Sequence, residues 1–206
     1  MESTLIGFRC RDFAMLAASG TSSHYYIKIC DDQDKIALLD SHKMIACCGE
    51  DGDMRNFVDI IRAQQAYEKA RLHGIQASTK YTANIIRDTL ASALRSRNGA
   101  YAVNSLLAGF DNPASSFDDT PAVSSLYYLD YLGTLVPVNF GAHGYGATFV
   151  TAIFDEQWRE DLTPEQGIAL MTKCIDEVKR RVSTSNAHFV TKVVSSTGTS
   201  LLPAVC

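Results

Sequence analysis

The first fifty residues alternate between short apolar segments and polar stretches. The apolar segments span residues 4–10, 13–18, 25–30, 36–39 and 43–48. The polar stretches include residues 19–23, rich in serine, and residues 31–34, which are mainly aspartate. Apolar runs that repeat about every ten residues, with turn-forming residues between them, are typical of β-strands. This part of the sequence therefore predicts an antiparallel meander whose turns include residues 19–23 and 31–34.

The apolar period changes to that of helices after Gly49 and Gly52. One helix is predicted over residues 53–72 and ends at His73-Gly74. A second is predicted over residues 79–97, with Ser78 as its N-cap and Asn98-Gly99 at its end. The apolar stripes consist of Phe57, Ile61, Ala66 and Ala70 in the first helix, and of Ile86, Leu90 and Leu94 in the second.

Strands are predicted again at residues 102–110 and 125–132. The polar segment between them, residues 111–123, holds two prolines and shows no period, so it is interpreted as a surface insertion. A helix is predicted from Gly144 to residue 154. A last hairpin is predicted from residues 188–195 and 199–202, with its turn at Thr197-Gly198.

The clearest helix of the chain begins at Thr163-Pro164-Glu165-Gln166. This is the pattern of a capping box with proline at the first helical position. The stripe that follows is apolar and consists of Ile168, Met171, Ile175, Val178 and Val182. Lys179, Arg180 and Arg181 lie in its last turn, where positive charge complements the helix dipole.

The order of elements is strands, two helices, strands, two helices, strands. Helices that come in pairs argue against a doubly wound parallel sheet. The predicted fold class is α+β, a four-layer αββα sandwich in which each of two antiparallel sheets is covered by a helix pair. Without an internal repeat or linker, residues 1–206 are expected to form a single domain.

Composition narrows the class of protein further. Hydrophobic residues make up 46% of the 206, charged residues make up 20%, and the net charge is −4. These values fit a soluble globular protein with no electrostatic footprint for nucleic acid or an anionic membrane. No membrane span or signal peptide is expected. The six cysteines, Cys10, Cys30, Cys47, Cys48, Cys174 and Cys206, are expected to be free thiols in a reducing compartment.

The motifs that could carry chemistry each depart from the pattern that the chemistry needs. Residues 141–147, GAHGYGA, lack phosphate-loop spacing and are interpreted as a tight turn with close backbone packing. The five histidines are scattered singly, and residues 31–34 lack the glycine and glutamate of a calcium loop. No cofactor-binding or metal-ligating residue is predicted.

Two hydroxyl residues, Ser3 and Thr4, stand at the start of the first predicted strand. An N-terminal nucleophile uses its own α-amine, with a pKa near 8, as the base for its side chain. Met1 and Glu2 precede Ser3, and the bulky Glu2 disfavours removal of both by methionine trimming. Ser3 and Thr4 are therefore expected to keep non-basic amide nitrogens, and no catalytic residue is predicted.

Several segments resemble the beta subunits of the 20S proteasome, most closely the kind that occupies the fourth position of the beta ring. They are LIGFRCRDFAMLAAS, DDQDKI, CCGEDGD, LRSRNGAYAVNSLLAGFD, LYYLDYLGTLVPVNFGAHGYGA and KCIDEVKRR. The sequence departs from that family in the long 111–123 loop and after Ser195. The resemblance implies the αββα fold of N-terminal nucleophile hydrolases.

The resemblance also implies which catalytic residues are missing. Active members carry a threonine freed by propeptide cleavage, an aspartate at the end of the second strand and a lysine shortly after. Here Glu2 falls at the nucleophile position and Ser19 at the aspartate position, whereas Lys35 matches the lysine. Active members also carry a serine in a Gly-Ser-Gly turn and a second aspartate ahead of the last strands. Here Tyr145 replaces that serine, and residues 182–189 contain no aspartate. Lys35 alone cannot carry out the catalytic mechanism of the active members, and it is expected to be a structural ion-pair partner.

The resemblance thus implies a non-catalytic structural beta subunit of the proteasome core, with no cofactor, in the cytoplasm and nucleus. Its expected partners are other alpha and beta subunits in a stacked four-ring hetero-oligomer, together with the unfolded proteins that the complex degrades, and neither nucleic acid nor membrane. Two alternatives remain open. One is an active threonine or serine hydrolase subunit with a mature N-terminus at Ser3 or Thr4. The other is a free-standing, monomeric binding domain.

Overall fold

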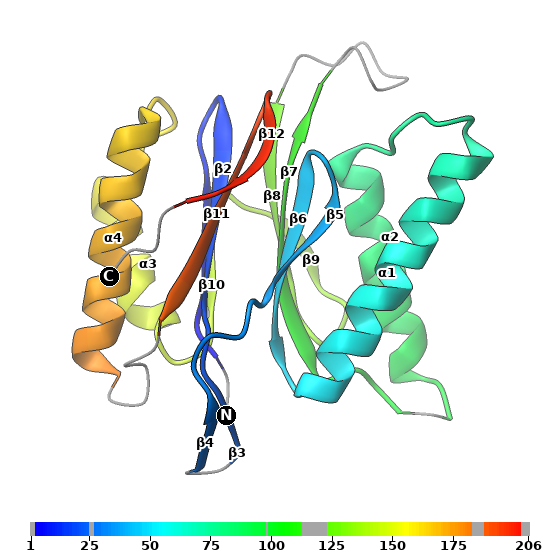
Figure 1. Cartoon of the computed structure of the whole chain (residues 1–206), viewed down its shortest axis with the longest axis horizontal. Coiled ribbons are helices and arrows are strands. Elements are labelled where there is room, and N and C mark those ends of the chain that lie inside the picture. The colour runs from blue at the N-terminus through cyan, green and yellow to red at the C-terminus, as the bar shows by residue number, and fades with distance from the viewer. Residues whose placement is uncertain (1–2, 25–26, 98, 113–122, 183–187, 203–206) are drawn as a thin grey trace.

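The computed structural model describes residues 3–24, 27–97, 99–112, 123–182 and 188–202. It has four layers, with two antiparallel sheets face to face and a helix pair outside each sheet (Figure 1). Helices α1 (Asp51–Arg71) and α2 (Thr79–Leu94) cover one sheet, and α3 (Ala147–Gln157) and α4 (Pro164–Arg181) cover the other. The predicted αββα sandwich is confirmed.

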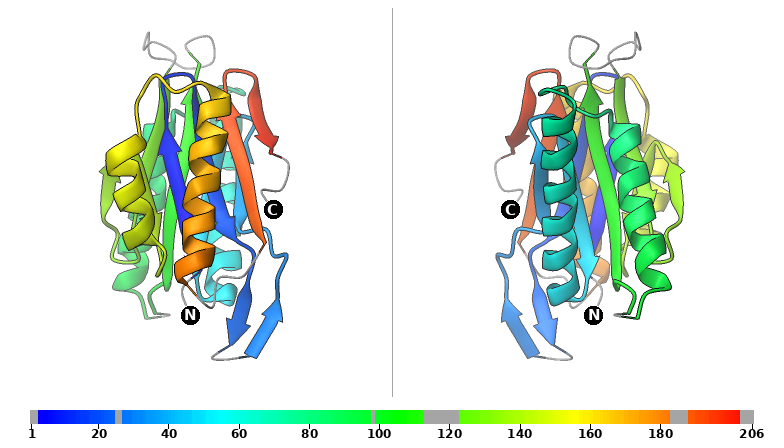
Figure 2. Two further views of the ribbon diagram at one scale, coloured as in Figure 1. Left: turned by 90° about the vertical axis from the view of Figure 1, so that its left-hand side faces the viewer. Right: turned by 90° about the vertical axis from the view of Figure 1, so that its right-hand side faces the viewer.

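Each large sheet has five strands, all paired antiparallel. The first sheet has the order β10 (Phe140–His143), β1 (Leu5–Arg9), β2 (Phe13–Ser19), β11 (Phe189–Ser195) and β12 (Gly198–Leu201). The second has the order β5 (Ile36–Asp40), β6 (Lys43–Gly49), β7 (Val103–Asp111), β8 (Val123–Leu129) and β9 (Leu135–Pro137). A separate hairpin, β3 (Ser22–His24) with β4 (Ile27–Cys30), projects from one end of the sandwich (Figures 1 and 2).

The predicted meander is wrong in its connectivity. Strands β1 and β2 belong to the first sheet, β5 and β6 to the second, and β3–β4 to neither. Part of the predicted turn at residues 19–23 is strand, because Ser22 and Ser23 pair with β4. The second predicted helix ends at Leu94, before residue 97, and the strand predicted over 125–132 runs from Val123 to Leu129.

The apolar core has three parts that match the layers. Between the sheets pack Leu16, Met44, Leu106 and Leu126, among others. Phe8, Phe154 and Met171 pack between the first sheet and α3–α4. Phe57, Ile86 and Leu107 pack between the second sheet and α1–α2. Cys47 lies in the α1–α2 part and Cys48 in the inter-sheet part, which confirms that these adjacent thiols point to opposite faces of β6.

Helix α4 begins as predicted. Thr163 Oγ1 accepts a hydrogen bond from the backbone N–H of Gln166 at 3.3 Å, and Gln166 Oε1 accepts one from the N–H of Thr163 at 3.0 Å. Of the predicted stripe, Met171, Ile175 and Val178 are fully buried, and Ile168 and Val182 pack against them partly exposed. Within the described residues, the model contains no helix with both the length and the apolarity needed to cross a membrane.

Candidate functional site around Lys35

The candidate site forms where the start of β1, the end of β2 and the start of β5 meet. The N–H of Ser19 donates to Thr4 O at 3.0 Å, which places the residues before β1 beside the end of β2. The N–H of Gln33 donates to Gly20 O at 3.0 Å, and the N–H of Cys47 donates to Lys35 O at 3.1 Å. These backbone bonds hold Lys35 next to Ser3, which lies 32 residues earlier in the chain.

Lys35 is 7% exposed and bonds to uncharged oxygens. Its Nζ donates to Ser3 Oγ and, at 2.5 Å, to Thr21 O. Ser3 Oγ in turn donates to the same Thr21 carbonyl at 3.3 Å. The predicted ion pair is wrong, since no ion pair joins Lys35 to any carboxylate among the residues described. The physical reason is Ser19, which stands at the end of β2 and brings no carboxylate.

Burial lowers the pKa of Lys35 below its ordinary value, because the charged ammonium loses solvent. The negative charge of Asp51 opposes this shift in the pKa. Asp51 is the first residue of α1, and its Oδ2 accepts a hydrogen bond from Ser22 Oγ at 2.5 Å. Asp51 was not among the residues predicted for the site. Its position in GEDGD, directly after a strand, could have drawn attention to it.

The turn at residues 144–146 packs against the start of β1. Gly144 has φ +84°, and a Cβ there would stand 2.6 Å from Ser3 O. A Cβ on Gly146 would stand 2.7 Å from Thr4 Cγ2. The tight turn with close backbone packing predicted for residues 141–147 is confirmed for residues 144–146, whereas residues 141–143 belong to β10 and Ala147 begins α3. Tyr145 is 63% exposed and, in the described part of the chain, forms no hydrogen bond with Ser3 or Lys35.

The hydroxyl that meets the lysine belongs to Ser3. The sequence had suggested Glu2 for the nucleophile position, and Glu2 lies outside the described residues. In this sequence Glu2 precedes Ser3, so the nitrogen of Ser3 is a basic amine only in a chain that begins at Ser3. Thr4, the other early hydroxyl residue, is 3% exposed. The site thus brings together a hydroxyl and an amine, and among the residues that the structure describes no carboxylate is hydrogen-bonded to either.

The other features predicted from the sequence have structural roles. Within the described residues no disulfide joins Cys10, Cys30, Cys47, Cys48 or Cys174, and Cys206 lies outside the described residues, as do residues 183–187. Burial raises the pKa of Cys10 and of Cys174 to about 12, so these thiols stay protonated at neutral pH. No group of three or more His, Cys, Asp or Glu side chains in the described part is placed to hold a metal ion.

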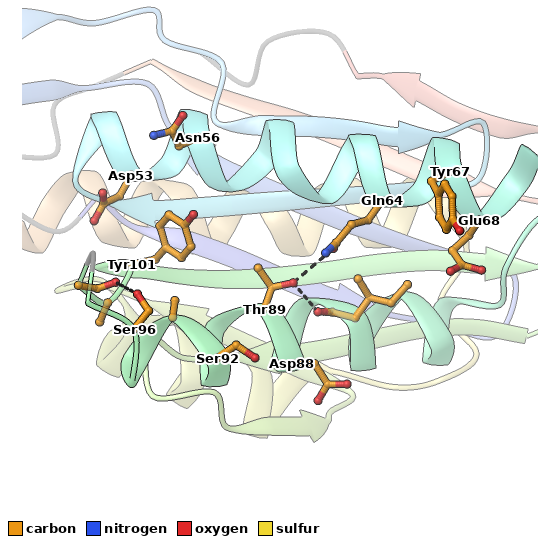
Figure 3. Close-up of a pocket in the computed structure, with 14 residues that line it drawn as sticks. Asp53, Asn56, Gln64, Tyr67, Glu68, Asp88, Thr89, Ser92, Ser96 and Tyr101 are labelled. Atoms are coloured by element: carbon orange, nitrogen blue, oxygen red, sulfur yellow. Dashed lines mark hydrogen bonds between the residues drawn. The ribbon is translucent and has the colours of Figure 1, made fainter.

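Two hollows flank α1. A groove of about 850 Å³ lies between α1 and α2 and is lined by both polar and apolar residues (Figure 3). Thr89 Oγ1 donates to Gln64 Oε1 at 3.3 Å across it, with Tyr101 toward one end and Tyr67 toward the other. No residue predicted for the site lines this groove. A cavity of about 410 Å³ lies on the other side, between β5 and α1, and Lys35 lines it.

The sequence matches the family model described as "Proteasome subunit" over residues 1–194. It is 53% identical over 205 residues to proteasome subunit beta type-2 of Trypanosoma brucei brucei, and the match covers 100% of both chains. It is 36% identical over 200 residues to proteasome subunit beta type-2 of Dictyostelium discoideum, covering 97% of this chain and 96% of the relative. Proteasome subunit beta type-2-A of Arabidopsis thaliana is 38% identical over 186 residues, with 90% and 86% covered.

Proposed function

From the fact that this chain belongs to the proteasome subunit family, as a beta subunit of the 20S core, we infer that it is a non-catalytic member. In this proposal it holds neighbouring subunits at the fourth position of the beta ring and forms part of the wall of the proteolytic chamber. The observation that carries the proposal is Ser3. Its hydroxyl contacts Lys35, but its nitrogen is an amide bonded to Glu2.

The chemistry of the site supports this proposal. An N-terminal nucleophile transfers its hydroxyl proton to its own free amine, and an amide nitrogen cannot accept that proton. Ser19 supplies no carboxylate at the end of β2 to support the lysine. Lys35 donates to Thr21 O as well as to Ser3 Oγ, so its ammonium joins the segments that directly precede β1 and β3. That role is structural.

The contact between Ser3 and Lys35 also favours a second candidate, an active serine hydrolase subunit. A hydroxyl hydrogen-bonded to a lysine of lowered pKa is the arrangement of Ser-Lys nucleophile and base pairs. This reading needs a mature chain that begins at Ser3 or Thr4, so that a free amine completes the site. The state of the N-terminus therefore separates the two candidates.

The rest of the proposal concerns partners and place. As a subunit of the core particle, the chain assembles with other proteasome subunits. We propose that these form a four-ring stack of alpha and beta subunits in the cytoplasm and nucleus, and that the complex degrades unfolded proteins, including ubiquitin-tagged ones. The αββα architecture supports such packing, because both helix layers face outward (Figure 2).

The test is to replace Ser3 and Thr4 by alanine, one at a time, in the assembled particle. We expect each class of peptide hydrolysis to keep its rate per particle, because loss of a true nucleophile costs about a millionfold in a serine protease. Mass spectrometry of the N-terminal peptide should find Glu2 still attached. Loss of one cleavage class at normal particle yield, or a free amine on Ser3 or Thr4, would refute the proposal.

A further inference from the structure

His143 joins the two sheets close to the candidate site. It is the last residue of β10, in the first sheet, and its side chain is buried. The ring stacks on Tyr128 of β8, and its Nε2 lies 3.2 Å from Ser105 O of β7, so both contacts are with the second sheet. The imidazole therefore holds the end of β10 against the second sheet.

The backbone around His143 packs against the start of β1. His143 pairs with Leu5 in the ladder between β10 and β1. The following residue, Gly144, lies so close to the N-terminal segment that a Cβ there would stand 2.6 Å from Ser3 O. The hydroxyl of the same serine accepts a hydrogen bond from Lys35 Nζ. The end of β10 therefore helps to set the position of Ser3 relative to Lys35.

Strand β10 lies where local opening of the sheet is least costly. It has four residues and lies at the edge of the first sheet, next to β1. Proteins open locally at such short peripheral elements with a smaller free energy than at central strands. Opening of β10 would bring the imidazole of His143 into water while β2, β11 and the second sheet stay paired.

The surroundings of His143 favour a neutral imidazole. Facing the ring are the phenol of Tyr128, the backbones of Ser105 and Leu129, and the carboxylate of Asp130, which follows β8. The two backbone groups and Asp130 favour the charged ring, but burial outweighs them and lowers the pKa of His143. Residues 147–154 of α3, which follows β10, add no charge. A ring that is released into water regains its ordinary pKa of about 6.5.

We propose that His143 acts as a pH-sensitive switch of the contact between Ser3 and Lys35. With a neutral imidazole, β10 is closed and residues 144–146 keep Ser3 beside Lys35. When the ring takes up a proton from water, the open arrangement of β10 is favoured and Ser3 separates from Lys35. This coupling goes beyond the proposed function and does not depend on whether the Ser3 nitrogen is an amide or a free amine, because it concerns the position of the serine.

The experiment is hydrogen exchange followed by mass spectrometry on the full-length chain between pH 7.5 and 5.5, with each rate divided by the intrinsic rate at that pH. Peptides covering residues 3–9 and 139–147 should lose protection together, by up to about tenfold per pH unit below about 6.5, because opening is linked to the uptake of one proton. Acylation of the Lys35 amine, relative to that of the exposed Lys173, should rise over the same range and reports the separation directly.

The matched variants are His143→Gln and His188→Gln. A glutamine amide can donate to Ser105 O but does not titrate, so the first variant should lose the pH response of both peptides. His188 is exposed, and its variant should keep the response. Local opening is distinguished from unfolding of the whole domain by adding about 1 M urea, which should leave the exchange of these peptides unchanged because local opening exposes little new surface.

Any of three results would overturn the proposal. They are a pH response that persists in His143→Gln, release of residues 139–147 without release of residues 3–9, and exchange of both peptides that accelerates with urea as global unfolding does. The last two are measured on the wild-type chain, so they decide the question even if His143→Gln fails to fold. The proposed function is tested separately, by the hydrolysis rates of the Ser3 and Thr4 variants.

Discussion

The inter-sheet core contains an ionisable group, His143. It is 4% exposed, its ring stacks on Tyr128 with 4.1 Å between centroids, and its Nε2 lies 3.2 Å from Ser105 O. Burial lowers the pKa of His143, because the charged imidazolium loses solvent, although the bond to Ser105 O partly opposes the shift. His143 therefore couples the packing of the two sheets to protonation.

We predict that the free energy of unfolding falls as the pH is lowered below about 6.5. The unfolded chain then binds a proton at His143, with an ordinary pKa of about 6.5, while the folded chain resists it. The contribution of neutral His143 to the free energy of unfolding is complete above that pH. It is lost as the pH falls toward the lower pKa that His143 has in the folded state. Urea unfolding of the purified chain between pH 5 and 8 measures this slope.

The matched variants for this measurement are His143→Gln and His188→Gln. The first should reduce the pH dependence of unfolding, and the second, an exposed side chain, should keep it. A slope that stays the same in His143→Gln would show that other groups are responsible.

Gly49 and Gly52, which are close in sequence, differ sharply in whether they have room for a Cβ atom. Gly49, at the end of β6, has φ +147°, and a Cβ there would lie 1.8 Å from Ala102 O, a backbone atom. We predict that Gly49→Ala destabilises the fold by at least about 1–3 kcal/mol, from backbone strain and the clash. Gly52 in the first turn of α1 has no atom within 4 Å of its Cβ position. Gly52→Ala should be neutral, or stabilise by up to about 1 kcal/mol.

Thermal unfolding of both glycine variants provides the comparison. A Gly49→Ala protein as stable as the wild type would mean that the β6–α1 junction can move away from Ala102. The geometry around Lys35 depends on that junction, because Asp51 begins α1 two residues after Gly49.

Among the elements, α4 depends most on its apolar stripe. Met171 is fully buried against the first sheet, whereas Ala169, on the same helix, is exposed. We predict that Met171→Asp destabilises the fold by about 3 kcal/mol or more, because an unpaired carboxylate would be buried. Ala169→Asp adds the same charge in solvent and should change the free energy of unfolding by less than about 0.5 kcal/mol. Chemical denaturation distinguishes the two, and equal stability of both variants would contradict the burial argument.

Elements with strong local signals could be predicted from the sequence. The capping box at Thr163 and the stripe through Ile175 fix α4 without any tertiary information. Strands β9 and β10 could not be found this way, because they have three and four residues and owe their pairing to β8 and β1. Strand β4 lies within the strand predicted over residues 25–30, but its partner β3 was missed, since Ser22 and Ser23 are common turn residues.

The site was predictable only in part. Lys35 could be found from the resemblance, but its contact with Ser3 depends on the pairing of β1 with β2 and on the turn at Gly144, which are far apart in sequence. The ion pair was predicted wrongly, because Lys35 was expected to have no hydroxyl within reach. Here a hydroxyl and a carbonyl accept its hydrogen bonds.

At the scale of the whole molecule, contacts tie the two sheets together along one side. Lys192 of the first sheet reaches Asp34 and the carbonyl of Ile36, and Thr199 of β12 donates its N–H to Ser41 O at 2.9 Å. These hydrogen bonds join the two sheets at this side of the sandwich. The helix pairs α1–α2 and α3–α4 face outward (Figures 1 and 2). The outer surfaces available for large interfaces are therefore mainly helical.

We predict that the endogenous chain travels in a particle of several hundred kilodaltons with other proteasome subunits, although the chain itself has a mass of 22.5 kDa. Stable protein interfaces bury about 1,200–2,000 Å² each, and obligate ones bury more, so a ring subunit stays assembled at cellular concentrations. Size-exclusion chromatography of a gentle lysate, followed by mass spectrometry of the fractions, measures the particle. The Met171→Asp chain should be depleted from the large fractions and the Ala169→Asp chain retained, because only the first variant disrupts the layer that supports α4. Recovery of most of the wild-type chain as a stable monomer would show that assembly is not its role and would restore the free-standing binding domain as the better explanation.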